Sequence, residues 1–190
     1  KYIELAIEND PTYVPAYILG GDIQVTMDNR EGALSWYRRA IAADKANPEG
    51  YLAYAALAMD TDSADAVRTL MGVRDYVPDY PVELALARMY ETRLDVAASL
   101  GYFDKADRDS MAEEDLVHYA MNHYVMGNYR QSLDVASYGH GRYPRNPVFN
   151  RLVFWNNTVL KNYDEALAYA DLLFNQSDNP EIVVEDYVSY

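Results

Sequence analysis

The sequence predicts an all-α protein built from repeated pairs of helices, and three observations predict it. The segment from Gly127 to Leu133 matches the segment from Lys161 to Leu167, with Tyr129 and Tyr163 at equivalent places. Small residues recur at nearly the same interval along the chain, and prolines or Asn-Pro pairs stand between them. Val and Ile are sparse and occur at helical spacing, so no strand pattern is present in the sequence.

A ladder of small residues marks the second helix of each pair. Its rungs, which are almost evenly spaced, are Ala33, Ala66, Ala98, Ser132 and Ala166. Positions four and seven places after a rung share one helical face with it. The first of these sets is Tyr37, Leu70, Tyr102, Ala136 and Ala170, and the second is Ala40, Val73, Lys105, Gly139 and Leu173. We therefore expect second helices over 31–44, 64–75, 94–105, 130–141 and 164–175.

The first helix of each pair follows a start signal. Asn47-Pro48 and Asn146-Pro147 place a capping Asn before a proline, which lacks only an N–H that would be unpaired in the first turn. Ser110 and Glu113 indicate a capping box. We expect first helices over 15–27, 48–59, 81–92, 111–126 and 147–160. The third pair is the least regular, because Lys105 stands at a small core position and Gly101 lies inside its second helix.

A helix pair repeated at this near-constant period resembles the tetratricopeptide repeat (TPR) family. The residues that carry the resemblance are Gly127, Tyr129, Ser132, Ala136, Gly139 and Pro144 in one unit, and Ala33, Tyr37 and Ala40 in another. The resemblance covers essentially the whole chain and implies a right-handed α-solenoid of about five antiparallel helix pairs. It predicts a single repeat domain over 1–190, with units at 1–11 (partial), 12–46, 47–79, 80–110, 111–145, 146–179 and 180–190 (partial). With partial units at both ends, we expect a fragment of a longer protein.

Composition excludes several classes of function. The 190 residues carry 30 acidic and 16 basic side chains, for a net charge of −14, and the basic residues are scattered. A protein that binds nucleic acid needs a basic surface, so nucleic acid is not an expected partner. The longest apolar stretch, Tyr51 to Met59, is too short for a membrane span. Cysteine is absent, and no signal-peptide pattern opens the sequence, so we leave open the cytoplasm and a bacterial periplasm or cell surface.

The candidate chemical groups favour structural roles. Glu114 and His118 could share a helix face, but no third metal ligand is evident. His123 falls on the core stripe, so we expect it inside the protein. Asp60 to Asp65 lacks the glycine and the final Glu of a calcium loop, and helix capping by Asp62 or Ser63 is the preferred interpretation. We expect no catalytic residues, no metal and no cofactor.

The resemblance implies a non-enzymatic scaffold that binds a protein or peptide in a concave groove. Two alternatives remain: a glycan or small-molecule module of an extracytoplasmic nutrient-uptake system, and an accessory repeat domain of a larger enzyme. Clamping of an acidic peptide terminus is not expected, since the faces that would carry the clamp show Ile18, Asp22, Leu52 and Ala56.

The groove is predicted from the stripe of each first helix that leans away from its core positions. The candidate groove residues are Tyr90, Val117, Met121, Tyr124, Arg151 and Trp155, with Tyr90, Tyr124 and Trp155 expected in one aromatic row. The alternative for Trp155 is a core position. We also expect self-association through end helices, by Ile3, Ala6 and Ile7 at one end and by Ile182, Val183 and Tyr187 at the other.

Overall fold

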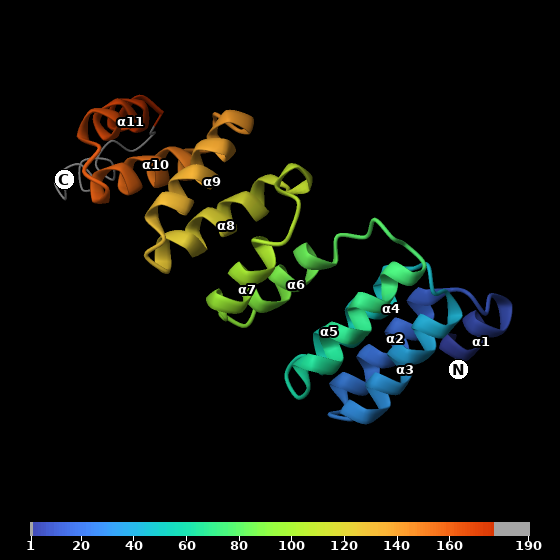
Figure 1. Cartoon of the computed structure of the whole chain (residues 1–190). Helices are drawn as coiled ribbons and strands as arrows, with labels where there is room; N and C mark the ends of the chain where they lie inside the picture. Colours follow the sequence, from blue (N-terminus) through green and yellow to red (C-terminus); the bar gives the residue numbers. More distant parts are fainter. Residues whose placement is uncertain (1, 177–190) are drawn as a thin grey trace. The chain divides into compact units, whose positions relative to one another are not determined.

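The computed structural model describes residues 2–176 and is helical throughout that range apart from short turns (Figure 1). The α-helices are α1 (Tyr2–Asn9), α2 (Val14–Thr26), α3 (Arg30–Ala43), α4 (Pro48–Ala58), α5 (Ser63–Met71), α6 (Val82–Glu91), α7 (Val96–Phe103), α8 (Glu113–Val125), α9 (Tyr129–Arg142), α10 (Pro147–Val159) and α11 (Tyr163–Gln176). Two short 3₁₀ helices, η1 (Gly72–Asp75) and η2 (Arg108–Ser110), complete them. The predicted all-α class is therefore confirmed.

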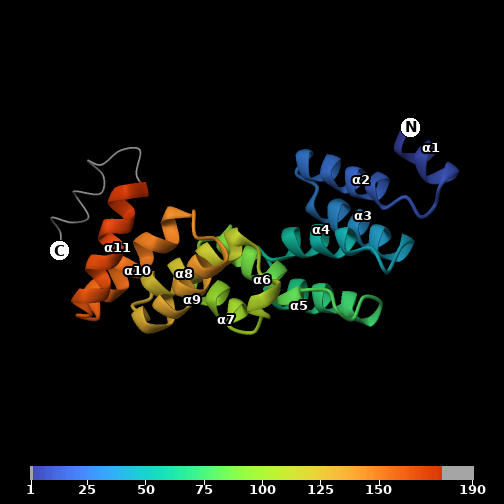
Figure 2. The ribbon, with the colours of Figure 1, turned by 90° about the horizontal axis from the view of Figure 1, so that it is seen from above.

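The chain divides into two compact units, residues 1–85 and 86–190, and the boundary falls within α6. In the first unit, α2 packs on α3, α3 on α4, and α4 on α5. In the second unit, α8 packs on α9, α9 on α10, and α10 on α11, and these helices lie side by side in both views (Figure 1, Figure 2). Consecutive helices thus pack on one another from α1 to α5 in the first unit and from α7 to α11 in the second.

The predicted helix boundaries mostly lie close to the observed ones, and the predicted caps explain several of them. Asn29, Asp62 and Asp95 each accept a hydrogen bond from the backbone N–H three places ahead, at 3.1, 2.9 and 3.0 Å. Asn47 and Asn146 cap α4 and α10 in front of their prolines. Capping by Asp62 is therefore confirmed.

Two expected helix boundaries were wrong. Ser110 does not cap α8, because it ends η2, and the N-cap residue of α8 is Ala112. Asp115, rather than Glu113, accepts the N–H of Ala112 at 3.0 Å. The helix expected over 64–75 tightens after Met71 into the 3₁₀ turn η1.

The third rung of the ladder was placed one residue early. Ser99 is fully buried in the third pair, whereas Ala98 is only half-buried. The rungs that are 0 % exposed are Ala33, Ala66, Ser99, Ser132 and Ala166. Each lies four places after the residue that opens its helix, namely Asn29, Asp62, Asp95, Asn128 and Asn162.

This shift also corrects the positions that follow the rung. Phe103, 1 % exposed, takes the core position assigned to Tyr102. Lys105 lies beyond the end of α7 and is exposed, so it does not replace a small core residue. The sequence obscured the register because Ala98 and Ser99 are both small.

Ser99 and Ser132 carry hydrogen bonds between successive repeats. Asn156 of α10 donates to the Ser132 hydroxyl at 2.7 Å, and that hydroxyl donates to the Ala120 carbonyl of α8 at 2.8 Å. One repeat earlier, Asn122 of α8 donates to the Ser99 hydroxyl at 3.3 Å. The two buried hydroxyls therefore join α7 to α8 and α9 to α10, in both cases the second helix of one repeat to the first helix of the next.

A left-handed residue lies two places before the first residue of α3, α7, α9 and α11. Asp28, Leu94, Gly127 and Lys161 have φ values of 56°, 58°, 77° and 64°, and only one of these four residues is glycine. A side chain in this conformation is disfavoured because its Cβ crowds the following carbonyl. Three of the four turns therefore carry local strain.

His123 lies inside the second unit, as expected. It is 5 % exposed, its ring centroid lies 4.9 Å from that of Tyr119, and its Nε2 is 3.4 Å from an Asp104 carboxylate oxygen. Burial lowers the pKa of His123 below its ordinary value, against the opposing charge of Asp104.

The N-terminal stripe expected for self-association is not the exposed one. Ile3, Ala6 and Ile7 are half-buried, and Ile7 packs against the core cluster formed by Val14, Tyr17 and Ala40. The exposed apolar side chains of α1 are instead Tyr2 and Leu5, at 85 % and 53 %. Ile182, Val183 and Tyr187 lie outside the described residues, and self-association stays a prediction.

Gly127→Ala should destabilise the second unit by about 1 kcal/mol because of its φ alone, since no atom lies within 4 Å of the added Cβ. Gly101→Ala is the matched control: it also adds a Cβ in open space, but within α7, where Ala is favoured by about 0.5–1 kcal/mol. Urea denaturation should shift the two midpoints in opposite directions. Equal shifts would contradict the conformational explanation.

Ser132→Ala should cost about 1–3 kcal/mol, because it leaves an Asn156 N–H buried without its acceptor. Adding Asn156→Leu should recover most of that loss, since an all-apolar contact needs no partner. A double-mutant cycle in urea measures the coupling. Strictly additive losses would show that the hydrogen bond does not join the repeats.

Stability should fall as the pH drops from about 7 to about 5.5, because of His123. Its folded pKa is lowered, so below the unfolded value of about 6.5 the unfolded chain binds a proton that the native chain does not. The wild type should lose about 1 kcal/mol more than His123→Phe over this window. Urea titrations at each pH, followed by Trp155 fluorescence in a Trp36→Phe background, measure the difference. Parallel pH profiles would assign the loss to other groups.

Candidate functional site

The first helices of the second unit, α6, α8 and α10, present the candidate site. Helix α8 buries Leu116, Ala120 and His123, and Tyr119 on the same side is half-buried. Its opposite face exposes Glu114, His118 and Val125 to solvent, with Met121 half-buried among them. We call these four residues of α8 the exposed face.

Three of the predicted groove residues lie together beside this face. The ring centroids of Tyr124 and Trp155 are 5.6 Å apart, and the Arg151 guanidinium carbon lies 5.8 Å from the Trp155 ring centroid. Tyr129, at the start of α9, adds an edge contact to Tyr124 at 5.5 Å. We call Tyr124, Tyr129, Arg151 and Trp155 the aromatic cluster.

Trp155 combines the two positions considered for it, one at the groove surface and one in the core. It is half-buried and packs against the cluster of Phe154, Ala166 and Leu173, so one part of its ring belongs to the core between α10 and α11. Another part meets Tyr124 at the seam between α8 and α10. The ring therefore joins the core to the surface.

Tyr90 does not continue the aromatic row, which corrects the sequence expectation. Its ring stacks on Tyr102 of α7 at 5.5 Å, with an angle of 11° between the ring planes. Helix α6 is turned so that Leu86 and Ala87 are fully buried, and Tyr90 falls on the same side. The expected row is thus limited to Tyr124 and Trp155.

Val117 and Met121 are both half-buried. Val117 lines a small hollow of about 340 Å³ between α8 and α10, together with Glu113, Glu114, Asn146 and Val148. Val117 therefore lies at the seam between the two helices. Met121, the other of these two predicted groove residues, lies on the exposed face.

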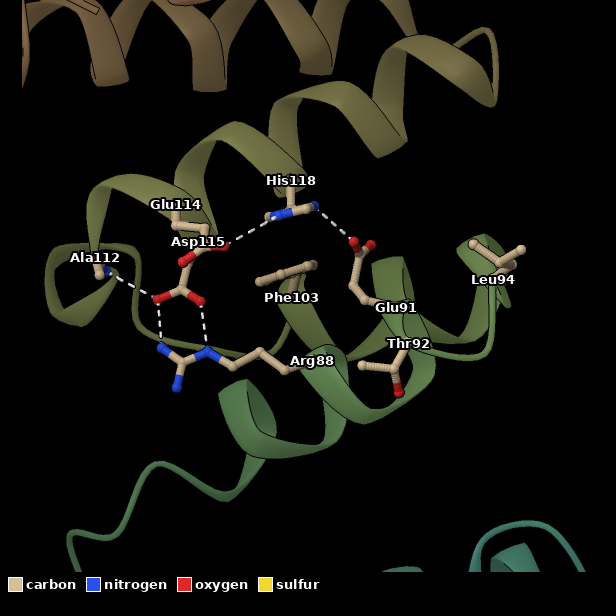
Figure 3. Close-up of a pocket in the computed structure, with 9 residues that line it drawn as sticks. All are labelled: Arg88, Glu91, Thr92, Leu94, Phe103, Ala112, Glu114, Asp115 and His118. Atoms are coloured by element: carbon tan, nitrogen blue, oxygen red, sulfur yellow. Dashed lines mark hydrogen bonds and ion pairs between the residues drawn. The ribbon is translucent and has the colours of Figure 1, made fainter. Parts of the chain in front are cut away.

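A larger cavity of about 520 Å³ lies between α6, α7 and α8, and sequence reasoning missed it (Figure 3). Its lining residues are Arg88, Glu91, Thr92, Leu94, Phe103, Ala112, Glu114, Asp115 and His118. Three carboxylates therefore face one guanidinium and one imidazole around a floor formed by Phe103. We call this the α6–α8 cavity.

One side of the cavity is closed by an ion pair. Arg88 donates to both carboxylate oxygens of Asp115, at 2.7 Å each, and Ala112 donates its N–H at 3.0 Å. Burial raises the pKa of Asp115, but these hydrogen bonds outweigh burial and hold the pKa below its usual range. The Asp115 side chain is only 4 % exposed, so its charge is neutralised inside the protein.

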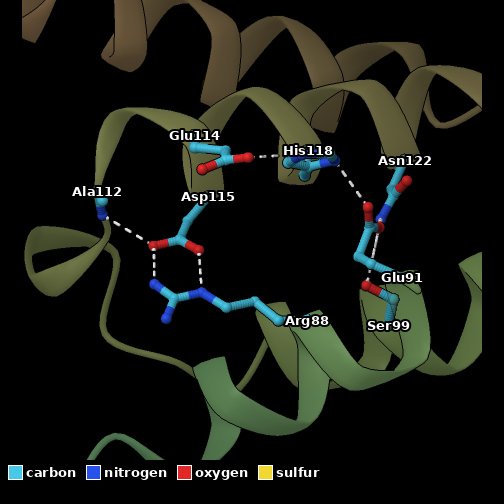
Figure 4. Close-up of polar contacts among 8 residues, drawn as sticks. All are labelled: Arg88, Glu91, Ser99, Ala112, Glu114, Asp115, His118 and Asn122. Atoms are coloured by element: carbon cyan, nitrogen blue, oxygen red, sulfur yellow. Dashed lines mark hydrogen bonds and ion pairs between the residues drawn. The ribbon is translucent and has the colours of Figure 1, made fainter.

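The other side is organised around Glu91 (Figure 4). One of its oxygens accepts from the Ser99 hydroxyl at 3.0 Å and from the Asn122 amide. The other lies 2.7 Å from His118 Nδ1, while His118 Nε2 lies 3.8 Å from Glu114. Glu91 is therefore fixed by α7 and α8, and His118 stands between two carboxylates.

The sequence contained part of this signal. Glu114 and His118 were placed on one face from their spacing, and they do lie together. Glu91 and Arg88 come from the preceding first helix, and Arg88 meets Asp115 across 27 residues. A single sequence gives no indication of which residues pair across that distance.

Two features of the described chain bear on other functions. Among residues 2–176, no group of three or more His, Asp or Glu side chains lies so that it could hold a metal ion. In the same range, no helix is both long enough and apolar enough to cross a membrane.

Comparison with known proteins identifies the fold. No family model matches the chain, and no curated protein matches it. Among solved structures, YrrB, a TPR protein with an unusual peptide-binding site, matches with a TM-score of 0.61 and 13% identity over 97% of each chain. MamA matches with a TM-score of 0.58 and 17% identity, over 86% of this chain and 91% of MamA.

PilF of Pseudomonas aeruginosa matches with a TM-score of 0.56 and 21% identity, over 99% of this chain and 87% of PilF. Together these structures define the class: this chain is an all-α helical repeat protein. Its fold is that of the tetratricopeptide repeat proteins, as the resemblance implied.

Proposed function

We propose that this protein is a non-enzymatic scaffold that binds a protein or peptide partner on the first helices of its second unit. The binding surface consists of the exposed face of α8 and the adjoining aromatic cluster. A glycan module, one of the two alternatives from the sequence, would use the same aromatic rings, so the binding test below is designed to separate it from a peptide scaffold.

The observation that carries the proposal is the composition of this surface. Tyr124 and Trp155 are half-buried, and Arg151 lies over the Trp155 ring. Val125 and Met126, which follow Tyr124 in the chain, are 63 % and 49 % exposed. Trp, Tyr and Arg are the residues that most often dominate binding energy at protein interfaces, and exposed apolar neighbours mark such sites.

Rigidity adds a second argument. The Trp155 ring packs on the core of α10 and α11, and Tyr124 is held between Trp155 and Tyr129. Side chains that are already ordered lose little conformational entropy when a partner binds. The aromatic cluster is therefore suited to bind without first rearranging.

The solved structures are consistent with this class of function. YrrB is described as a TPR protein with a peptide-binding site, and that description belongs to YrrB. For this chain, the binding of a peptide is the proposal, and the residues that bind it are those of the exposed face and the aromatic cluster.

Val125→Asp tests the proposal with short random peptides selected by display against the full chain. Val125 is exposed, so the variant should change stability by less than about 0.5 kcal/mol. It should lower the affinity for the selected peptides by at least about tenfold, because the introduced carboxylate would lose its water in the interface. Affinity is measured by fluorescence anisotropy of labelled peptides.

Phe174→Asp on α11 is the matched control, since it makes the same charge change at a side chain that is 55 % exposed on a second helix. It should leave affinity within about twofold. Equal losses in the two variants, or failure to select any peptide, would contradict the proposal. Binding of glycans in place of peptides would favour the alternative class.

A further inference from the structure

We propose that the α6–α8 cavity receives a basic side chain, a lysine or arginine of the partner. This inference rests on the proposed function, because it names the chemistry of the partner that binds the first helices. Three observations carry it: the cavity itself, the charges that line it and the residues at its rim.

The lining of the cavity holds more carboxylates than guanidinium groups. Arg88 is the one guanidinium in the lining, and it is paired with the buried Asp115. The remaining carboxylates of the lining are those of Glu91 and Glu114, whose side chains are 19 % and 88 % exposed. A cation entering the cavity would therefore find two carboxylates, and an anion would be repelled by them.

Both carboxylates have hydrogen-bonding capacity for such a ligand. A carboxylate has about four lone-pair sites. Glu91 accepts two bonds at one oxygen and contacts His118 at the other, and Glu114 lies 3.8 Å from His118, beyond hydrogen-bond distance. His118 lies between the two acids, with one on either side of its ring (Figure 4).

The backbone of α6 adds to the negative electrostatic potential of the cavity. Glu91 is the last residue of α6, and the C-terminal end of a helix carries a partial negative charge that favours cations. Thr92 and Leu94, which follow this end, line the cavity with it (Figure 3). The charged group of the ligand would thus lie where the field of α6 favours it.

The rim fits the aliphatic stem of a basic side chain. Leu94 is 86 % exposed and has a φ of 58°, although the equivalent residue of the next repeat is Gly127. A large apolar residue there is disfavoured by its backbone conformation and by its exposure. Lys and Arg bury their methylene groups on such apolar surface while the charged head reaches a polar group.

The overall charge is complementary to a basic partner. The chain carries a net charge of −14, which speeds the approach of cationic ligands over longer distances. The cavity volume of about 520 Å³ lies within the range of ligand-binding pockets and exceeds that of one side chain.

Hexalysine, acetylated and amidated at its ends, is the probe, with hexaglutamate as its counterpart, at about 0.15 M salt. Titration followed by NMR should shift the amide signals of cavity residues with hexalysine and not with hexaglutamate. Glu114→Lys changes a highly exposed position and should lower the affinity for hexalysine by at least about tenfold, since the attraction of a carboxylate is replaced by the repulsion of an ammonium group. Glu165→Lys on α11 makes the same change in net charge outside the cavity and should weaken it by less than about threefold.

Leu94→Gly separates binding from folding. It relieves the left-handed conformation, so the thermal midpoint should rise, whereas the affinity for hexalysine should fall by about threefold or more because the apolar rim is lost. Equal losses in Glu114→Lys and Glu165→Lys, or equal binding of hexaglutamate, would overturn the inference.

The two proposals can fail separately. If peptides selected by display lose affinity in Val125→Asp but carry no excess of Lys or Arg, and Glu114→Lys leaves them unaffected, the basic side chain is ruled out and the interaction surface stands. If no peptide is selected and hexalysine shifts no signal of the cavity, both proposals are contradicted.

Discussion

Close packing at five fully buried small residues is the constraint on which the rest of the structure depends. The second helix of each of the five pairs contains one such residue that is 0 % exposed: Ala33, Ala66, Ser99, Ser132 and Ala166. A small side chain lets neighbouring helices approach closely, and larger residues at the following positions, such as Tyr37 and Phe103, fill the space on either side. The near-constant interval between rungs is thus set by packing.

One of these small buried residues also forms part of the candidate site. Ser99 is a rung of the ladder, and its hydroxyl donates to Glu91 at the edge of the α6–α8 cavity. Asn122 donates to both residues, so α6, α7 and α8 meet at one hydrogen-bonded point. The acid in the cavity is therefore positioned by the core of the repeat, as preorganised binding requires.

Much of the fold could be predicted from the sequence, because periodicity, caps and prolines are local signals. The five helix pairs were found in order, and Asp62 and His123 have the predicted roles. The register of α7 was missed because both Ala98 and Ser99 are small enough to be a rung, and only burial distinguishes them.

The site was harder to predict because its contacts join different repeats. Glu114 and His118, four places apart, were correctly placed on one helix face, whereas Arg88 and Asp115 are 27 residues apart. Tyr90 was misplaced because the rotation of α6 about its axis depends on which residues its neighbours bury. Spacing defines the stripes of a helix but does not determine which stripe faces solvent.

The hydroxyl rungs also bear on how the repeats find their correct neighbours. Repeats of similar sequence can pair out of order during folding, with one helix taking the place of its homologue. Asn122 and Asn156 oppose such exchange, because Ala33 and Ala66 carry no hydroxyl that could accept from either buried amide. The two serine rungs thus distinguish the later repeats from the earlier ones during folding.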